Sequence, residues 1–136
     1  ELDRASAICG AAAIIAEKLD ARYLVTFTQS GTSARLLSRL RTPIPMLAFT
    51  PLESTRRQLA LSWGIHAYRV PEVTLTDDMV WQVDQVAQSA RLAGVGDEMV
   101  IVAGMPPGTP GSSNLLRVHR LGDEVDYAIG GARSDA

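Results

Sequence analysis

The sequence predicts an α/β fold, a three-layer α/β/α sandwich built on a mostly parallel, five-stranded sheet. Segments with apolar residues at three- and four-residue spacing alternate along the chain with short, continuous apolar runs. Amphipathic helices produce the first pattern, and strands buried on both faces of a parallel sheet produce the second. The last two apolar runs are joined by a loop too short for a helical crossover, so we expect the last strand to be antiparallel.

The composition indicates one domain and excludes several classes of protein. The chain has 136 residues, enough for a single core, and its net charge of −2 gives no electrostatic case for binding nucleic acid or an anionic membrane. No apolar run is long enough to span a bilayer. Cys9 is the only cysteine, which rules out an internal disulfide and fits the reducing cytoplasm. The chain begins without methionine, directly in a helical pattern, which suggests a fragment of a longer protein.

Two helices are expected in the first 40 residues, separated by one strand. The helix over 4–19 has an apolar stripe that includes Cys9 as a small buried hydrophobe. The strand over 23–28 is continuously apolar and therefore buried on both faces. The apolar stripe of the second helix consists of Leu36, Leu37 and Leu40. Arg35 and Arg39 share another face of that helix, which is solvated or contacts a neighbouring domain.

A second strand and a third helix follow. We expect the strand over 44–50 and the helix over 53–63, with Gly64 as the C-cap of that helix. The next strand covers 65–70, and His66 is expected there as a strand residue near a sheet edge rather than as a ligand.

The fourth helix begins with a charged turn. Thr76 is the expected N-cap, and Asp77 and Asp78 favour the positive end of the helix dipole. The two carboxylates could also ligate a cation, although a charged first turn is the commoner explanation. Strands over 99–103 and 115–121 complete the sheet.

The most informative stretch is the turn between the first strand and the second helix. Four hydroxyl side chains surround a glycine there, in the run Thr28, Gln29, Ser30, Gly31, Thr32 and Ser33. A helix start carries free backbone N–H groups and partial positive charge, so this turn can cradle a phosphate or another small anion. Residues such as Ser30 and Thr32 also cap helices routinely, so capping is the alternative interpretation.

A second informative stretch, over 104–114, is rich in glycine and proline. It follows the C-terminal end of a strand, where open α/β sheets bind ligands. It could equally be a rigid connector.

Several kinds of catalytic machinery are missing from the sequence. No lysine follows the Ser30-Gly31 turn as in a P-loop, and no Gly-x-Gly-x-x-Gly fingerprint follows the first strand. No nucleophile elbow occurs that His66 or His119 could serve, and no residues have metal-ligand spacing. The sequence therefore predicts a binding site without catalytic residues and without a metal.

Five segments, in order, resemble the C-terminal domain of pyruvate kinases of the bacterial type. They are 25–35 (VTFTQSGTSAR), 38–45 (SRLRTPIP), 57–65 (RQLALSWGI), Gly96-Asp97 with the apolar strand that follows, and 104–115 (GMPPGTPGSSNL). Each segment is weak evidence alone, but together they are specific and span most of the chain. The resemblance implies a family domain over 1–122, followed by a frayed tail over 123–136.

The resemblance also implies a function. Pyruvate kinases transfer the phosphoryl group of phosphoenolpyruvate to ADP with Mg²⁺ or Mn²⁺ and usually K⁺, in a separate barrel domain, so this fragment is expected to be inert alone and without a cofactor of its own. The family's C-terminal domain often binds a phosphorylated effector in the turn that matches 28–33. The loop that closes over such a ligand matches Gly104, Pro107, Gly108, Gly111 and Ser112. The family is cytoplasmic and tetrameric, and the last strand would be an edge that pairs with its twin in a second copy.

One departure from the family's pattern bears on the effector. Members that respond to fructose 1,6-bisphosphate use an arginine in the fourth helix for the second phosphate. That place falls near Met79, beside Asp77 and Asp78, whose carboxylates would repel a phosphate. We therefore expect a monophosphate, such as a sugar monophosphate or AMP. Two alternatives to an effector-binding domain of pyruvate kinase remain. One is an assembly domain whose effector site is vestigial, and the other is a free-standing α/β protein that binds a small molecule.

Overall fold

The computed structural model describes residues 4–62, 64–73, 75–104 and 113–124. The elements in chain order are α1 (Arg4–Leu19), β1 (Tyr23–Phe27), α2 (Thr32–Arg39), β2 (Met46–Thr50), α3 (Glu53–Leu59), β3 (Ile65–Arg69), α4 (Thr76–Ser89), β4 (Glu98–Gly104) and β5 (Ser113–Arg120). The strands form one sheet in the order β3-β2-β1-β4-β5. Neighbouring strands are parallel except β4 and β5, which are antiparallel. The predicted fold class and the antiparallel last strand are confirmed.

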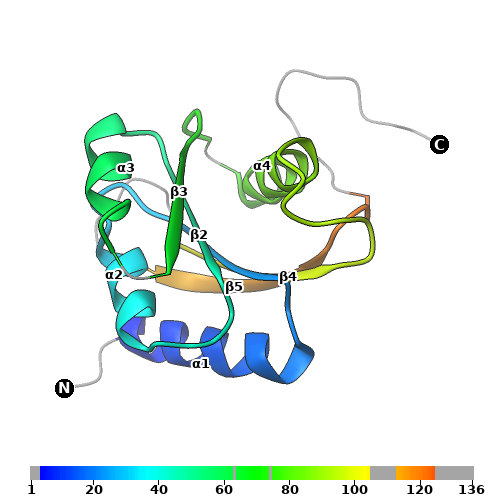
Figure 1. Cartoon of the computed structure of the whole chain (residues 1–136), viewed down its shortest axis with the longest axis horizontal. Coiled ribbons are helices and arrows are strands. Elements are labelled where there is room, and N and C mark those ends of the chain that lie inside the picture. Colours follow the sequence, from blue (N-terminus) through cyan, green and yellow to red (C-terminus); the bar gives the residue numbers. More distant parts are fainter. Residues whose placement is uncertain (1–3, 63, 74, 105–112, 125–136) are drawn as a thin grey trace.

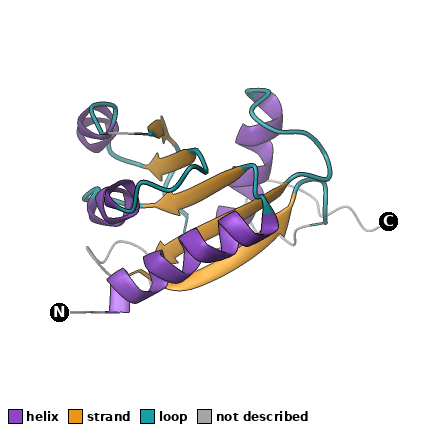
Figure 2. Ribbon diagram, turned by 60° about the horizontal axis from the view of Figure 1, so that its bottom comes forward, coloured by secondary structure: helices purple, strands orange, loops and turns teal. Residues whose placement is uncertain are grey.

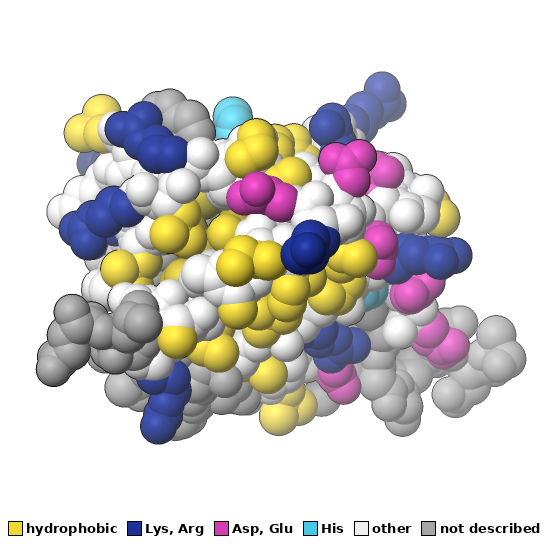
Figure 3. Space-filling model, turned by 90° about the horizontal axis from the view of Figure 1, so that it is seen from below, with side chains coloured by type: hydrophobic (Ala, Val, Ile, Leu, Met, Phe, Trp, Pro, Cys, Tyr) yellow, Lys and Arg dark blue, Asp and Glu magenta, His cyan; other side chains and the backbone are white. Residues whose placement is uncertain are grey.

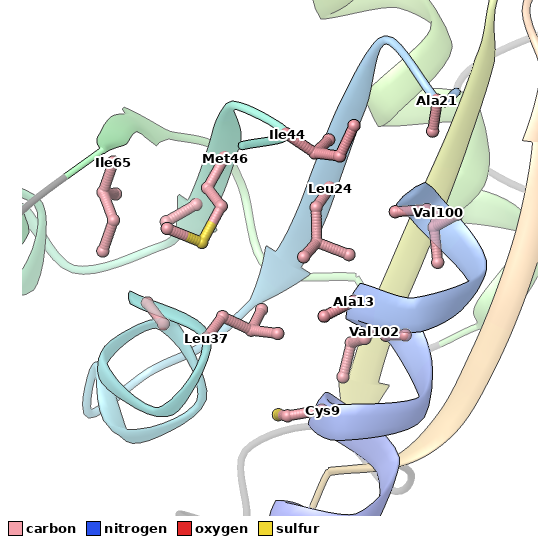
Figure 4. Close-up of a cluster of buried hydrophobic side chains, with 14 of the residues drawn as sticks. Cys9, Ala13, Ala21, Leu24, Leu37, Ile44, Met46, Ile65, Val100 and Val102 are labelled. Atoms are coloured by element: carbon pink, nitrogen blue, oxygen red, sulfur yellow. The ribbon is translucent and has the colours of Figure 1, made fainter. Parts of the chain in front are cut away.

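The helices cover both faces of the sheet. In Figures 1 and 2, α1 runs along one face of the sheet and α4 lies on the other. Two groups of buried side chains fill the two interfaces, one shared by α1, α2 and α3, the other formed with α4. Cys9 is 1% exposed in the first group, as predicted from its place on the apolar stripe (Figure 4).

The strand order reverses at β1, and such a reversal marks the part of the sheet edge where open α/β folds bind ligands. From β1 the chain adds β2 and β3 on one side, and it then crosses to the other side of β1 to add β4. The carboxyl ends of β1 and β4 therefore flank a topological switch point, the position where open α/β sheets bind ligands. The turn over 28–33 and the loop after β4 both start at this edge.

Two helix ends differ from the sequence-based expectation. The third helix stops at Leu59, because Leu61 and Ser62 donate to carbonyls three residues back and tighten the last turn. Gly64, with φ +70°, therefore lies in the turn before β3 and is not a helix cap. The fourth helix begins at Thr76, but its N-cap is the extended Leu75, whose carbonyl accepts the first helical hydrogen bond.

The second helix is shorter than its apolar stripe suggests. Leu37 is fully buried against the sheet, and Leu36 is partly buried, but Leu40 is 46% exposed. The helix ends at Arg39, so Leu40 lies beyond the last turn and turns away from the core. His66 is confirmed as an exposed residue of β3, at one edge of the sheet.

Candidate functional site

The turn between β1 and α2 is built around a left-handed residue. Gly31 has φ +89° and ψ −1°, a conformation that costs glycine little and other residues more. Its N–H donates to Thr28 Oγ1 at 2.8 Å. This bond folds the chain sharply at the carboxyl end of β1, so that α2 starts directly at the sheet edge.

Two hydroxyl groups meet at the start of α2. Ser30 Oγ and Thr32 Oγ1 lie 2.9 Å apart within hydrogen-bonding distance, and the N–H of Thr32 donates to Ser30 Oγ at 3.4 Å. The N-cap is Gly31, and α2 has no side-chain cap hydrogen bond. Neither Ser30 nor Thr32 is therefore the N-cap residue, although Ser30 Oγ does accept a hydrogen bond from the first N–H of the helix.

Two of the predicted site residues are directed elsewhere. The side-chain amide of Gln29 donates to Glu72 Oε1 at 2.8 Å, in the segment after β3. The carbonyl of Gln29 accepts a hydrogen bond from Thr55 Oγ1 of α3 at 2.6 Å. Ser33 is only 5% exposed and packs inside the molecule. The structure thus gathers Thr28, Ser30, Gly31 and Thr32, and it directs the side chain of Gln29 away from that group.

The predicted loop is described only at its first residue. Gly104 is the last residue of β4 and lies opposite Ser113 of β5, at an irregularity in the strand register. Pro107, Gly108, Gly111 and Ser112 lie outside the described residues. Because β4 pairs with β1 in parallel, β4 ends at the same sheet edge as the turn that carries Ser30.

Arg35 lies at the candidate site, although the helical pattern predicts it on a solvated face or one that contacts a neighbouring domain. Its guanidinium folds back over the turn, where Nη1 donates to the carbonyl of Ser30 at 3.0 Å and Nη2 donates to Gln58 Oε1 at 3.2 Å. Arg35 is half-buried, whereas Arg39 is exposed. The four-residue spacing from Gly31 to Arg35 was the available signal, since side chains in a helix point back toward its N-terminus.

The first turn of α4 is less negative than its two aspartates suggest. Asp77 Oδ1 accepts a hydrogen bond from Arg117 Nη1 of β5 at 2.7 Å. Asp78 is 2% exposed and lies inside the molecule. The carboxylate of Asp77 is therefore compensated by a guanidinium, and its repulsion of an approaching phosphate is reduced accordingly.

A cavity of about 640 Å³ lies at the opposite, amino-terminal edge of the strands. Its lining includes the carboxylates of Glu17, Asp20, Asp97 and Glu98 and one guanidinium, that of Arg22. This excess of negative charge disfavours a phosphate there. The β1–α2 turn is consequently the better candidate for an anion site.

Glu53 at the start of α3 is held ionised by two arginines. Arg56 donates to both carboxylate oxygens at 2.7 Å, and Arg57 Nε donates to Oε2 at 3.1 Å. The hydrogen bonds from Arg56, and then those from Arg57, lower the pKa of the Glu53 carboxyl from its ordinary value of 4.5 to about 2.

We expect the Glu53 carboxyl carbon to titrate with a midpoint near 2 in carbon-detected NMR. Because the pKa is lower in the folded state, the stabilisation from this cluster is complete above pH 4.5 and disappears as the pH falls to about 2. The substitution Arg56→Gln should move the midpoint up toward 4.5. The control Arg91→Gln alters an exposed residue beyond α4 and should not move it. A midpoint near 4.5 in the unaltered protein would contradict the expectation.

The described residues contain neither of two other kinds of site. Among them, no three or more His, Cys, Asp or Glu side chains are grouped so that they could hold a metal ion. Within the same part of the chain, no helix combines the length and the apolarity that a membrane span needs.

Comparisons with known proteins agree with the fold and with the resemblance. Residues 6–119 match the family described as pyruvate kinase, alpha/beta domain. The chain is 51% identical over 114 residues to the pyruvate kinase of Mycobacterium tuberculosis and 46% identical over 114 residues to that of Corynebacterium glutamicum. Each match covers 84% of this chain and 24% of the relative, so the chain spans about a quarter of their length.

Among solved structures, the chain is similar to a Cryptosporidium parvum pyruvate kinase in complex with ADP. The TM-score is 0.79 and the sequence identity 26%, over 89% of this chain and 24% of that one. The matched family domain covers most of the described fold, including β1, the turn after it and β4. The chain therefore belongs to the pyruvate kinase family and has the fold of its C-terminal α/β domain.

Proposed function

We propose that this chain is a regulatory and assembly domain of a pyruvate kinase, and that its β1–α2 turn binds the phosphate group of a small effector. The observation that carries the proposal is the pair of hydroxyls of Ser30 and Thr32, 2.9 Å apart at the left-handed Gly31 turn. The turn begins α2 and lies at the topological switch point of the sheet, which supports the same position for a ligand.

The chemistry of the turn suits a phosphate. A helix N-terminus offers backbone N–H donors and partial positive charge, and hydroxyl groups add donors that rotate to meet an anion. The hydroxyls of Ser30 and Thr32 are within reach of one another, so each can exchange that contact for a phosphate oxygen. The half-buried guanidinium of Arg35 adds positive charge beside the turn.

We propose a monophosphate rather than a bisphosphate. At the start of α4 the charges of Asp77, Asp78 and Arg117 sum to −1, and the guanidinium is already engaged by Asp77. A second phosphate at this place would have to compete with that carboxylate for Arg117. A single phosphate held at the β1–α2 turn avoids the competition.

The proposed parent enzyme transfers a phosphoryl group from phosphoenolpyruvate to ADP in the cytoplasm, as the last step of glycolysis. Its barrel domain would carry the catalytic residues and the Mg²⁺ or Mn²⁺ and K⁺ ions. The present chain would contribute an effector site and a contact between subunits, and it would be inert alone. Residues 123–136 would form a tail outside the family domain.

A second candidate function is assembly without an effector. Within the described sheet β5 has β4 as its single neighbour, so its other edge is open to a strand of a second copy. The face crossed by α1 carries a band of hydrophobic side chains (Figure 3), and Ile14 of α1 is 57% exposed. These observations support a homo-oligomeric contact, which need not depend on the turn.

Calorimetric titration with glucose 6-phosphate, ribose 5-phosphate, AMP and fructose 1,6-bisphosphate tests the proposal. We expect at least one monophosphate to bind saturably. A hydrogen bond to a charged group is worth about 1.5–3 kcal/mol, so Ser30→Ala/Thr32→Ala should weaken binding by about a hundredfold or more. The control Ser89→Ala removes an exposed hydroxyl at the far end of α4 and should bind as the unaltered chain does.

The outcomes separate the two candidates. Binding that survives in Ser30→Ala/Thr32→Ala would overturn the placement of the site. If none of the four compounds binds and analytical ultracentrifugation shows a dimer, the assembly role stands without the effector role.

A further inference from the structure

Arg35 connects the β1–α2 turn to helix α3. Its Nη1 donates to the carbonyl of Ser30 at 3.0 Å, and its Nη2 donates to Oε1 of Gln58 at 3.2 Å. Its own backbone N–H donates to the carbonyl of Gly31 at 3.0 Å. Arg35 thus binds the carbonyls of Ser30 and Gly31 and a side chain 23 positions further along the chain.

The guanidinium lies directly against the backbone of the turn. A Cβ atom placed on Gly31 would come within 3.0 Å of Arg35 Nη1 and 3.1 Å of Cζ. Glycine is favoured at this position by its left-handed φ, and any side chain there would press against the guanidinium of Arg35.

We propose that Arg35 is the positioning residue of the proposed anion site, and that through Gln58 it ties the conformation of that site to helix α3. The inference rests on the proposed function, since it concerns how the same turn is held. By binding the Ser30 carbonyl, Arg35 fixes the peptide unit between Ser30 and Gly31. The direction of the Ser30 hydroxyl and of the N–H groups that follow depends on that peptide unit.

Helix α3 anchors this arrangement at a second point. Thr55 Oγ1, one turn before Gln58, donates to the carbonyl of Gln29 at 2.6 Å. Two consecutive carbonyls of the turn, those of Gln29 and Ser30, are therefore held by α3, one directly and one through Arg35. A shift of α3 along the sheet would move both carbonyls and so change the geometry offered to the anion.

A planar guanidinium suits this role better than an ammonium does. It presents donors in a rigid fork, and two of them are directed at Ser30 O and Gln58 Oε1. A lysine would keep the positive charge near the turn but would not span the same two acceptors in a fixed plane. The role of Arg35 as a positioning group can therefore be separated from its charge.

The experiment uses the 136-residue chain. It measures the affinity for glucose 6-phosphate and the amide hydrogen exchange of the β1–α2 turn. Arg35→Lys keeps the charge, and Gln58→Ala leaves the net charge unchanged. Each loses a hydrogen bond that orders the turn, so we expect about fivefold weaker binding in each. Arg39→Gln removes the charge of an exposed arginine one turn away and should change affinity by less than about twofold.

Amide hydrogen exchange in the absence of glucose 6-phosphate tests independently whether Arg35 and Gln58 order the turn. Gly31 N–H and Thr32 N–H should exchange faster in Arg35→Lys and Gln58→Ala, while the amides of β1 should exchange as in the unaltered chain. A lower global stability would instead raise the exchange rates of the turn amides and of the β1 amides alike.

Each result supports or overturns the inference. Wild-type affinity in Arg35→Lys would show that charge alone suffices, and wild-type affinity in Gln58→Ala would remove the link to α3. If the unaltered chain binds no phosphate, the proposed function fails, whereas the inference about the turn still depends on the exchange of Gly31 and Thr32. Unchanged exchange in both variants would overturn it.

Discussion

Asp84→Ala is expected to lower the free energy of unfolding by about 2–4 kcal/mol, because it removes the buried acceptor that three neighbouring groups share. Asp84 Oδ2 lies 2.7 Å from His119 Nε2 and accepts a hydrogen bond from the N–H of Gly122 at 3.1 Å. Its Oδ1 accepts a hydrogen bond from the side-chain amide of Gln88. The side chains of Asp84 and His119 are 7% and 4% exposed, so water has little access to the His119 nitrogen once the carboxylate is removed.

Urea denaturation followed by circular dichroism measures the loss. If Asp84→Ala does not fold, Asp84→Asn keeps the shape and one acceptor oxygen and should show a smaller loss. The control Asp123→Ala removes an exposed carboxylate 4.0 Å from Arg120 and should change the free energy by less than about 0.5 kcal/mol. A loss below about 1 kcal/mol in Asp84→Ala would show that the network does not hold α4 against β5.

Leu37→Ala is expected to cost about 2–5 kcal/mol, while Leu40→Ala costs about 0.5 kcal/mol or less. The two changes are chemically identical and lie three positions apart. Leu37 is fully buried in the cluster with Leu24 and Met46 (Figure 4), so its truncation leaves a cavity. Leu40 is 46% exposed beyond the end of α2, so its truncation leaves none.

Thermal unfolding in a calorimeter compares the two leucine variants directly. The melting temperature of Leu37→Ala should fall well below that of Leu40→Ala. Since α2 begins at the proposed anion site, Leu37→Ala should also weaken glucose 6-phosphate binding when measured close to its melting temperature. Similar melting temperatures for the two variants would contradict the packing of α2 described here.

Several features could be predicted from the sequence because they depend on neighbouring residues. Apolar spacing alone distinguishes helices from buried strands, and a short connection alone makes β5 antiparallel. The hydroxyl-rich turn around Gly31 was recognised in the same way, since a glycine and its flanking hydroxyls are adjacent in the chain. The burial of Cys9 followed from its place on one helical stripe.

Helix ends were less predictable. The choice of Leu75 over Thr76 as N-cap, and the early end of α3 at Leu59, depend on how the chain enters and leaves the sheet. Leu40 has the spacing of a core residue, yet the path toward β2 turns it outward. A local pattern shows which side chains are apolar, but the packing of the whole chain decides which of them are buried.

The sequence by itself determined the fold class and the family, and it predicts where the candidate site lies. The tertiary structure decided which distant groups meet: Arg35 with Gln58, 23 positions apart, at the candidate site, and Asp84 with His119, 35 positions apart, between α4 and β5. It also directed Gln29 toward Glu72 and away from the hydroxyl cluster. Contacts between residues distant in sequence form only when the helices dock on the sheet, because no local spacing rule sets the distance between their side chains.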